Sequence, residues 1–537
     1  MTNLMIATPA KKSKTHHLTI ADGLFILIGA ATAVIRLTEL SKLPLSPAEA
    51  QEALAVWQFW QPGTAVLSIS SPAYFTFTAM LTPLLGISDG VMRLVPALFG
   101  ILLVLLPWLL RDRLSTVGAL ITAVFLTVSP IAVAISRTAG GDSIALFAAF
   151  LLLIAWVNGR DSGNGRWFYL FTIALALGLT SSPLFYSALV TLSVAWLGQR
   201  FIGPRLFSDD EDGRLETAVL RNGLIAGGIL FLLISTFFLL SLGNVGAAAS
   251  ILGDWLNQFG GFGTLSNALE PFLAIVRYEI GLLVVGLVAI MWAAWRSQTL
   301  PMFSVYWLIG MLLLLVVQQG VILNAALIIL PLYLIIGAFS GAIIGQRIGW
   351  HGWLLTGGLL LLWALIFVNS SRFLRKMTFN ADDLGNVWIV LFALAFALTT
   401  IFFAIGWDAR ATYQAVLLSV LLMLLFYNWG TAWWLGHEGG NDPRETWVSE
   451  GTDDGMLVLA NVLNDLSWQL SRSDQDIDIL STVDTPALRW YLRDYVNAEI
   501  GKTAPLDTNA TIVITSATDP TTLGNSYMGS DYAISRT

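Results

Sequence analysis

Six charged residues in the first 142 positions could together carry out acid–base chemistry on an anionic substrate. They are Glu39, Glu49, Glu52, Arg93, Arg137 and Asp142. A carboxylate can take the proton of an attacking hydroxyl or amine, and arginines can stabilise a departing phosphate. A charge at the centre of a membrane helix costs about 2.5–3.5 kcal/mol on insertion scales, so charges kept beside apolar segments need a reason. We interpret this set as a candidate site for a phosphate-bearing substrate.

A structural interpretation of the same residues is also open. Glu49 and Glu52 are one helical turn apart and could form the solvated face of a surface helix. Arginines at helix ends often only anchor to lipid headgroups. Arg137 and Asp142 could form a local salt bridge at the start of a helix. Spacing alone does not decide between the two interpretations.

The composition indicates a polytopic integral membrane protein. The chain has 537 residues, of which 56% are hydrophobic and 12% charged. Its apolar runs repeatedly reach the roughly 20 residues needed to cross a bilayer. Lys11, Lys12 and Lys14 precede the first run, and no small-residue cleavage site follows it. We therefore expect a retained first helix and a cytoplasmic N-terminus.

The same composition argues against several kinds of site. There is no cysteine, which excludes disulfides, thiol nucleophiles and cysteine-based metal sites. His437 and Glu438 lack a second nitrogen ligand nearby, so we assign no metal-binding residues and leave a requirement for a divalent metal undetermined. The net charge of −7, without a clustered basic face, argues against nucleic acid as a partner.

Loop charge predicts about thirteen membrane crossings. If residues 72–87 lie along the outer surface, nearly all loop arginines fall on the cytoplasmic side, as the positive-inside tendency expects. The C-terminus is then outside, and the protein is a multi-pass protein of the plasma membrane. The predicted crossings are 20–37, 94–110, 116–135, 142–158, 167–182, 184–199, 222–242, 274–294, 301–318, 321–343, 352–369, 386–406 and 411–430.

Two domains are expected. Residues 1–436 form an α-helical transmembrane domain whose external loop, residues 38–93, carries surface helices. Residues 437–537 are more polar and acidic, and they predict a small extracytoplasmic α/β domain. Its expected elements are a helix at 455–470, a strand at 476–483, a helix at 485–497 and a strand at 510–517.

Several stretches, in their order along the chain, carry a family resemblance. LPLSPAEAQEALAVWQFW, SSPAYFTFTAML, SDGVMRLVPALFG and the Ser-Arg-x-x-x-x-Asp turn at 136–142 resemble the N-terminal half of GT-C superfamily membrane glycosyltransferases. The branch is similar to glycosyltransferase family 39, with the protein O-mannosyltransferases and aminoarabinose transferases. HEGGNDPRETWVSEGTDDGMLVLANVL and PALRWYLRDY resemble the external tail of a prokaryotic subgroup described as flippase-activity-associated.

The resemblance implies transfer of a sugar, with inversion, from a polyprenyl-phosphate donor to an acceptor at the extracytoplasmic face. A donor carried on a lipid would explain why the enzyme sits in membrane lipid. The acceptor would offer a hydroxyl or an amine, on a protein or on a lipid-linked glycan. An oligomer, or a complex with other membrane proteins, is left open.

The resemblance also suggests residue roles. The family has an Asp-Glu pair where this chain has Ala48 and Glu49. It would pair Glu49 with Arg93 and leave Glu52 to accept the proton, so Glu49 and Glu52 are the catalytic candidates. The substrate-binding candidates, which take in two aromatic residues that could instead belong to the interfacial belt, are Arg93, Arg137, Asp142, Tyr74 and Trp57.

Two other functions remain in view. Because Ala48 replaces the family's aspartate, the protein could be a catalytically silent scaffold or an accessory subunit of a membrane complex. A flippase for lipid-linked sugars is the weaker alternative, because the sequence has no evident inverted repeat.

Overall fold

The computed structural model describes most of the chain. The described residues are 19–62, 69–202, 216–241, 244–259, 265–318, 320–345, 347–376, 384–448, 450–473, 475–501, 508–516 and 527–536. Lys11, Lys12 and Lys14, which underlie the predicted N-terminal orientation, lie outside these ranges.

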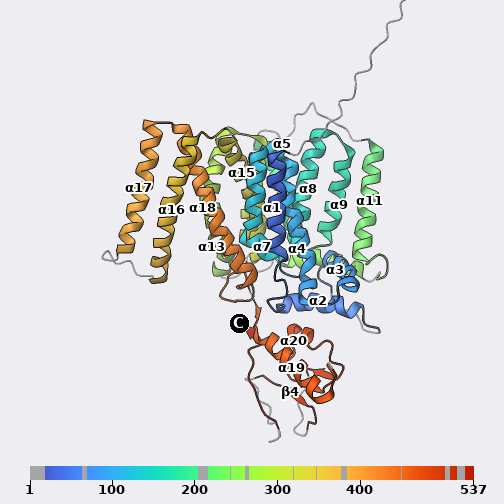
Figure 1. Cartoon of the computed structure of the whole chain (residues 1–537). Coiled ribbons are helices and arrows are strands. Elements are labelled where there is room, and N and C mark those ends of the chain that lie inside the picture. The colour runs from blue at the N-terminus through green and yellow to red at the C-terminus, as the bar shows by residue number, and fades with distance from the viewer. Residues whose placement is uncertain are drawn as a thin grey trace, which may run out of the picture.

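A layer of roughly parallel apolar helices forms the body of the molecule (Figure 1). Among the described residues, ten helices are long and apolar enough to cross a membrane, or eleven if a bent pair counts as one span. The helices in these ten spans are α1 (Ile20–Leu37), α4 (Asp89–Leu105), α8 (Asp142–Ser162), α11 (Thr217–Ser235), α13 (Leu265–Arg296), α14 (Thr299–Val317), α15 (Ala325–Ile344), α16 (Trp350–Lys376), α17 (Leu384–Gly406) and α18 (Ala409–His437).

The polytopic helical fold is confirmed, while the count of thirteen stays a prediction. Each predicted crossing coincides with a helix. However, α9 (Gly165–Leu179) has only 15 residues, and α10 (Pro183–Ile202) does not qualify as a candidate span. The bent pair is α6 (Thr116–Val128) and α7 (Pro130–Ser136), which meet at 61°. Proline at 130 has no N–H to continue the ladder of α6, and Ser129 caps the new helix instead.

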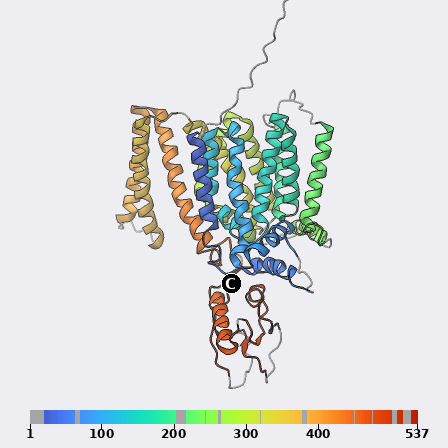
Figure 2. The ribbon, with the colours of Figure 1, turned by 45° about the vertical axis from the view of Figure 1, so that its right-hand side comes forward.

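Short helices cover one end of the bundle. They are α2 (Pro47–Phe59), α3 (Pro72–Leu85) and α12 (Val245–Asn257), and α2 runs across the bundle end (Figures 1 and 2). Both α2 and α3 begin with a serine N-cap followed by proline, a pairing that starts a helix abruptly. Neither is among the candidate spans, in line with the surface position predicted for residues 72–87.

A small α/β unit follows α18. Its helices are α19 (Gly455–Ser471) and α20 (Pro486–Tyr491). Strand β2 (Ile479–Ser481) lies between β3 (Ala498–Ile500) and β4 (Ile512–Ile514), in parallel. Strands β1 (Gly451–Thr452) and β5 (Ser535–Arg536) pair antiparallel. The helix predicted at 485–497 ends at Tyr491, because the chain turns there to supply the unpredicted strand β3. The domain boundary at 436/437 stays a prediction.

This unit is docked on the helix-covered end of the bundle through Asp89, at the start of α4. Its carboxylate accepts hydrogen bonds from Trp490 Nε1 at 2.7 Å and Tyr491 Oη at 2.6 Å. The same Tyr491 hydroxyl accepts from Leu45 N at 3.2 Å. Trp490 is fully buried. The start of a membrane helix therefore fixes the position of α20 against α2.

Replacing Asp89 with alanine should loosen this docking. Trp490 and Tyr491 would each lose a half-buried acceptor, which we expect to lower the free energy of unfolding by about 1–3 kcal/mol. Hydrogen exchange should rise at residues 486–500. Asp465→Ala, on the exposed side of α19, should change stability by less than about 0.5 kcal/mol and leave this exchange unchanged. Equal exchange in both variants would contradict the docking role.

Candidate functional site

The Glu49 carboxylate accepts four hydrogen bonds at the covered end of the bundle. It lies in the first turn of α2, where it accepts from Ser46 N at 2.9 Å to complete a capping box. It also accepts from Ala139 N at 2.8 Å, and from Arg93 Nε at 2.8 Å and Nη2 at 2.7 Å. Burial alone would raise the pKa of Glu49, but Arg93 and the backbone donors outweigh it and hold the pKa below its ordinary value.

Arg93 is fully occupied by this arrangement. Beyond the fork to Glu49, its Nη1 donates to Leu40 O and Leu43 O at 3.0 and 2.7 Å, and its Nη2 donates to Pro44 O at 3.0 Å. All five N–H groups of the guanidinium thus have acceptors. The Glu49–Arg93 pair that the resemblance implied is present, and it anchors the loop between α1 and α2.

Arg137 is held differently. It lies at the end of α7, where Nε donates to Gly436 O at 2.7 Å, Nη1 to Thr38 O at 2.7 Å and Nη2 to Glu39 O at 3.2 Å. Among the described residues it forms no ion pair, with Asp142 or any other carboxylate. Burial and the nearby Arg93 charge lower the pKa of Arg137 to about 10, so it stays charged at neutral pH. One Nη2 hydrogen remains for a further acceptor.

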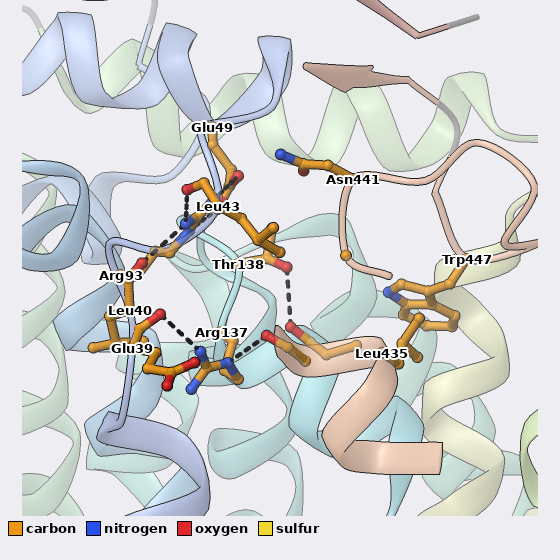
Figure 3. A pocket seen from close by; sticks show the side chains of 13 residues that line it. Glu39, Leu40, Leu43, Glu49, Arg93, Arg137, Thr138, Leu435, Asn441 and Trp447 are labelled. Atoms are coloured by element: carbon orange, nitrogen blue, oxygen red, sulfur yellow. Dashed lines mark hydrogen bonds and ion pairs between the residues drawn. The ribbon is translucent and has the colours of Figure 1, made fainter. Parts of the chain in front are cut away.

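A narrow cleft separates the two arginines (Figure 3). Its lining includes Glu39, Glu49 and Thr138 on one side and Asn441 and Trp447, from the segment after α18, on the other. The free space is about 40 Å³, enough for a few water molecules. In this state the cleft has no room for a sugar.

Glu52 and Asp142 form a second, acidic side of the site. Glu52 lies one turn after Glu49 on α2, and Ser70 donates to it from both its side chain and its backbone. Oε2 of Glu52 is buried and has no hydrogen-bond partner among the residues that the structure describes. Burial, with the nearby Asp142 charge, raises the pKa of Glu52 to about 7. The group can therefore exchange a proton near neutral pH.

Asp142 owes its position to the glycine before it. A Cβ at Gly141 would lie 2.1 Å from Ser181 O and 2.3 Å from Ser71 Oγ, so only glycine allows the chain to approach these loops. Asp142 is the first residue of α8, and its side chain forms a hydrogen bond with the side chain of Ser182. Loop 137–141 thus places Arg137 on the cleft side of Glu49 and Asp142 on the Glu52 side.

Neither aromatic candidate lines the cleft between the two arginines. Tyr74 is completely buried and donates from its hydroxyl to Met92 O at 2.9 Å. Trp57 is partly buried and lines a groove between α2 and the C-terminal unit, with Arg489 and Arg493 opposite. Their predicted contacts with substrate remain predictions.

Two buried charges that the sequence analysis did not select hold the break between α6 and α7. Arg36 of α1 donates to Leu126 O and Thr127 O, at 3.0 and 3.1 Å, at the end of α6. Glu279 of α13 accepts from Ser129 Oγ at 2.5 Å and from the backbone of Ile131, at the start of α7. A cation at a helix C-terminus and a carboxylate at an N-terminus both complement the helix dipole.

This arrangement sets the direction of α7 and therefore the position of Arg137 at its end. Tyr333 of α15 donates to Glu279 Oε2 at 3.0 Å, which ties a third helix to the break. Arg36 and Glu279 are charged residues inside predicted crossings, and this sequence signal could have identified them.

A metal ion has no ready-made site here. Across the described ranges no group of three or more His, Asp or Glu side chains could hold one. Glu52 and Asp142 supply only two carboxyl groups.

The fold is similar to that of GT-C membrane glycosyltransferases, and the resemblance predicted from the sequence is confirmed at the level of the fold. Residues 70–202 match the family described as dolichyl-phosphate-mannose-protein mannosyltransferase. This segment, about a quarter of the chain, contains Arg93, Arg137 and Asp142 but neither Glu49 nor Glu52.

Two solved structures of one protein support the same fold. ArnT from Cupriavidus metallidurans, bound to undecaprenyl phosphate, gives a TM-score of 0.54 at 14% identity, over 89% of this chain and 86% of that chain. Its apo state gives 0.52 at 14% identity, over 88% and 85%. The oligosaccharyltransferase AglB from Archaeoglobus fulgidus gives 0.45 at 12% identity, over 89% and 64%. No curated protein sequence matches the chain.

Glu49→Gln should destabilise the protein strongly. It removes the charge from a buried pair and leaves Arg93 uncompensated, which typically costs about 3–5 kcal/mol. Because the pKa of Glu49 is lowered by folding, this stabilisation is present at neutral pH and is lost as pH falls through the acid range. Thermal unfolding in detergent measures both effects. Glu438→Gln, from the exposed pair with Lys42, should cost less than about 1 kcal/mol.

Glu279→Ala should loosen the helix break. The N-terminus of α7 and the hydroxyls of Ser129 and Tyr333 would lose their buried acceptor, for an expected loss of about 1–3 kcal/mol. Glu270→Ala, a carboxylate on the same helix, should change the unfolding midpoint little. Equal midpoints for the two variants would show that the break does not depend on Glu279.

Proposed function

We propose that this protein transfers a sugar from a polyprenyl-phosphate donor to an acceptor hydroxyl or amine at the extracytoplasmic face, with inversion. The observation that carries the proposal is the free, buried oxygen of Glu52, at the rim of a GT-C fold and with a pKa of about 7. A carboxyl kept without a partner near neutrality is suited to accept a proton.

In the proposed reaction the acceptor oxygen or nitrogen attacks the anomeric carbon of the sugar. The bond from that carbon to the phosphate oxygen breaks, and polyprenyl phosphate leaves with the bonding electrons. The acceptor proton moves to Glu52. Asp142, one of the two carboxyls here, orients the acceptor by accepting a hydrogen bond. Attack opposite to the leaving phosphate inverts the anomeric centre.

Arg137 is the better candidate of the two arginines to bind the phosphate. Arg93 has spent all five donors on Glu49 and loop carbonyls. Arg137 is buried, carries no carboxylate partner among the described residues and keeps a donor for the cleft. The phosphate would compensate the charge of Arg137. This attraction would strengthen as negative charge develops on the leaving phosphate. The solved ArnT structure contains undecaprenyl phosphate, which supports a lipid phosphate as ligand for this fold.

The lipid tail of the donor would stay in the bilayer while the sugar reaches the covered end of the bundle. Because α2, α3 and the C-terminal unit gather at that end (Figure 2), we infer that it faces the extracytoplasmic side. The cleft must open for a sugar to enter, and the segment after α18, with Asn441 and Trp447, is the wall that lines it from the C-terminal side.

A catalytically silent scaffold is the second candidate. Two observations favour it: Ala48 stands where the family has aspartate, and every oxygen of Glu49 is engaged. Position 48 is four residues before Glu52, so the two side chains are neighbours along one helix face. A carboxylate at either position would therefore reach the same rim. Activity measurements on variants at positions 48 and 52 can thus distinguish the enzyme from the scaffold.

Glu52→Gln should lower kcat by about 10²- to 10⁴-fold, because it removes the proton acceptor. Transfer from a polyprenyl-phosphate sugar by purified protein measures it. Ala48→Asp, added to Glu52→Gln, should restore part of the activity from the adjacent turn. Glu438→Gln serves as the control and should match the unmodified protein. Full activity in Glu52→Gln would remove Glu52 as the base, and no transfer by the unmodified protein would favour the scaffold.

The pH dependence tests the same residue. Activity of the unmodified protein should rise with pH through about 7 as Glu52 loses its proton. Since folding raises this pKa, ionised Glu52 destabilises the fold, and stability should fall as pH rises from about 4.5 to above 7. In Glu52→Gln that slope should flatten. An unchanged slope would contradict the buried, raised pKa.

A further inference from the structure

A large crevice lies at the opposite end of α18 from the candidate site. It opens where α16 begins, α17 ends and α18 begins, and it has a volume of about 720 Å³. That volume falls within the usual range of small-molecule sites, roughly 300–1,000 Å³. The hairpin of α16 and α17 stands at the edge of the bundle and packs on α18 (Figure 1).

The mouth of this crevice is cationic and aromatic. Arg347 and Arg410 both line it, and Asp408 is the only carboxylate in the lining. His351 lies between Trp350 and Trp407 in tilted ring contacts, with centroids 3.9 and 4.9 Å apart, and Phe403 stacks on Trp407 at 5.5 Å. Neither arginine forms an ion pair among the described residues. The mouth therefore has positive charge available for an anion.

The interior of the crevice is apolar and open. Leu354, Leu355 and Phe403 line it, and it reaches Gly358, two turns into α16. A Cβ added at Gly358 would meet no atom within 4 Å. The crevice thus runs from a charged rim to the apolar part of a membrane helix. A phospholipid has the same two parts, a charged headgroup and an apolar acyl chain.

We propose that this crevice binds an anionic phospholipid, with the phosphate between Arg347 and Arg410 and one acyl chain beside Leu354 and Phe403. Basic pockets between membrane helices bind anionic headgroups, each Arg or Lys near the surface contributing about 1 kcal/mol. Free phosphate has no acyl chain to fill the apolar interior of the crevice. The interior therefore favours a phospholipid over free phosphate. The bound lipid fills the wedge between the α16–α17 hairpin and α18, and the proposal does not depend on the proposed transferase activity.

The test uses the purified full chain, with native mass spectrometry to count bound lipid and thermal unfolding to measure stabilisation. The probes are phosphatidylglycerol, phosphatidylcholine with the same acyl chains, and glycerol phosphate. We expect retained phosphatidylglycerol with a raised unfolding midpoint, and neither effect with the other two. Equal retention of both phospholipids would overturn a site for an anionic headgroup, and stabilisation by glycerol phosphate would overturn the role of the chain.

Variants locate the site. The double substitution Arg347→Gln and Arg410→Gln should weaken phosphatidylglycerol binding about 10- to 30-fold. Gly358→Leu, whose Cβ would meet no atom within 4 Å, should narrow the apolar interior and also weaken binding while leaving the arginines in place. Arg200→Gln removes an arginine that lies over Trp196 on α10, away from the crevice, and should bind as the unmodified protein does. Unchanged affinity in both crevice variants would overturn the proposal.

Discussion

The buried fork between Glu49 and Arg93 is the interaction on which the covered end of the bundle depends. One carboxylate joins the start of α2, the start of α4 and the loop at Ala139, and the guanidinium collects three carbonyls of the loop before α2. Each partner satisfies donors or acceptors that would otherwise be buried without bonds. The pair therefore fixes both Glu52, one turn further along α2, and the turn that leads to Asp142.

The cations at this end fall into two kinds. Arg93 is neutralised by a carboxylate, whereas Arg36 and Arg137 are held by backbone carbonyls alone among the described residues. The charge of Arg36 is compensated by the negative C-terminal end of α6, within the fold itself. Arg137 faces the cleft with a donor to spare. The difference gives a physical reason to assign the proposed phosphate contact to Arg137 and not to Arg93, although Arg93 and Arg137 were equal candidates in the sequence.

Much of the fold followed from hydropathy and loop charge. The thirteen predicted crossings coincide with helices, and α3, within residues 72–87, is not among the candidate spans, in line with the position predicted from Pro72, Pro83 and the arginine distribution. The parallel sheet after α18 was only half anticipated, because β3 is a short edge strand without a period long enough to recognise. Glu279 could not be ranked from its sequence position, because its role exists only where α13 meets the broken helix of another segment.

The sequence by itself determined that the protein is a polytopic helical membrane protein, because hydropathy acts on each segment separately. It also predicted which charges a substrate site could use. Only the tertiary structure decided how those charges are shared: Glu49 is consumed by four donors, while Glu52 keeps a free oxygen. Hydrogen-bond capacity and burial depend on neighbours far apart along the chain, and spacing along one helix does not contain that information.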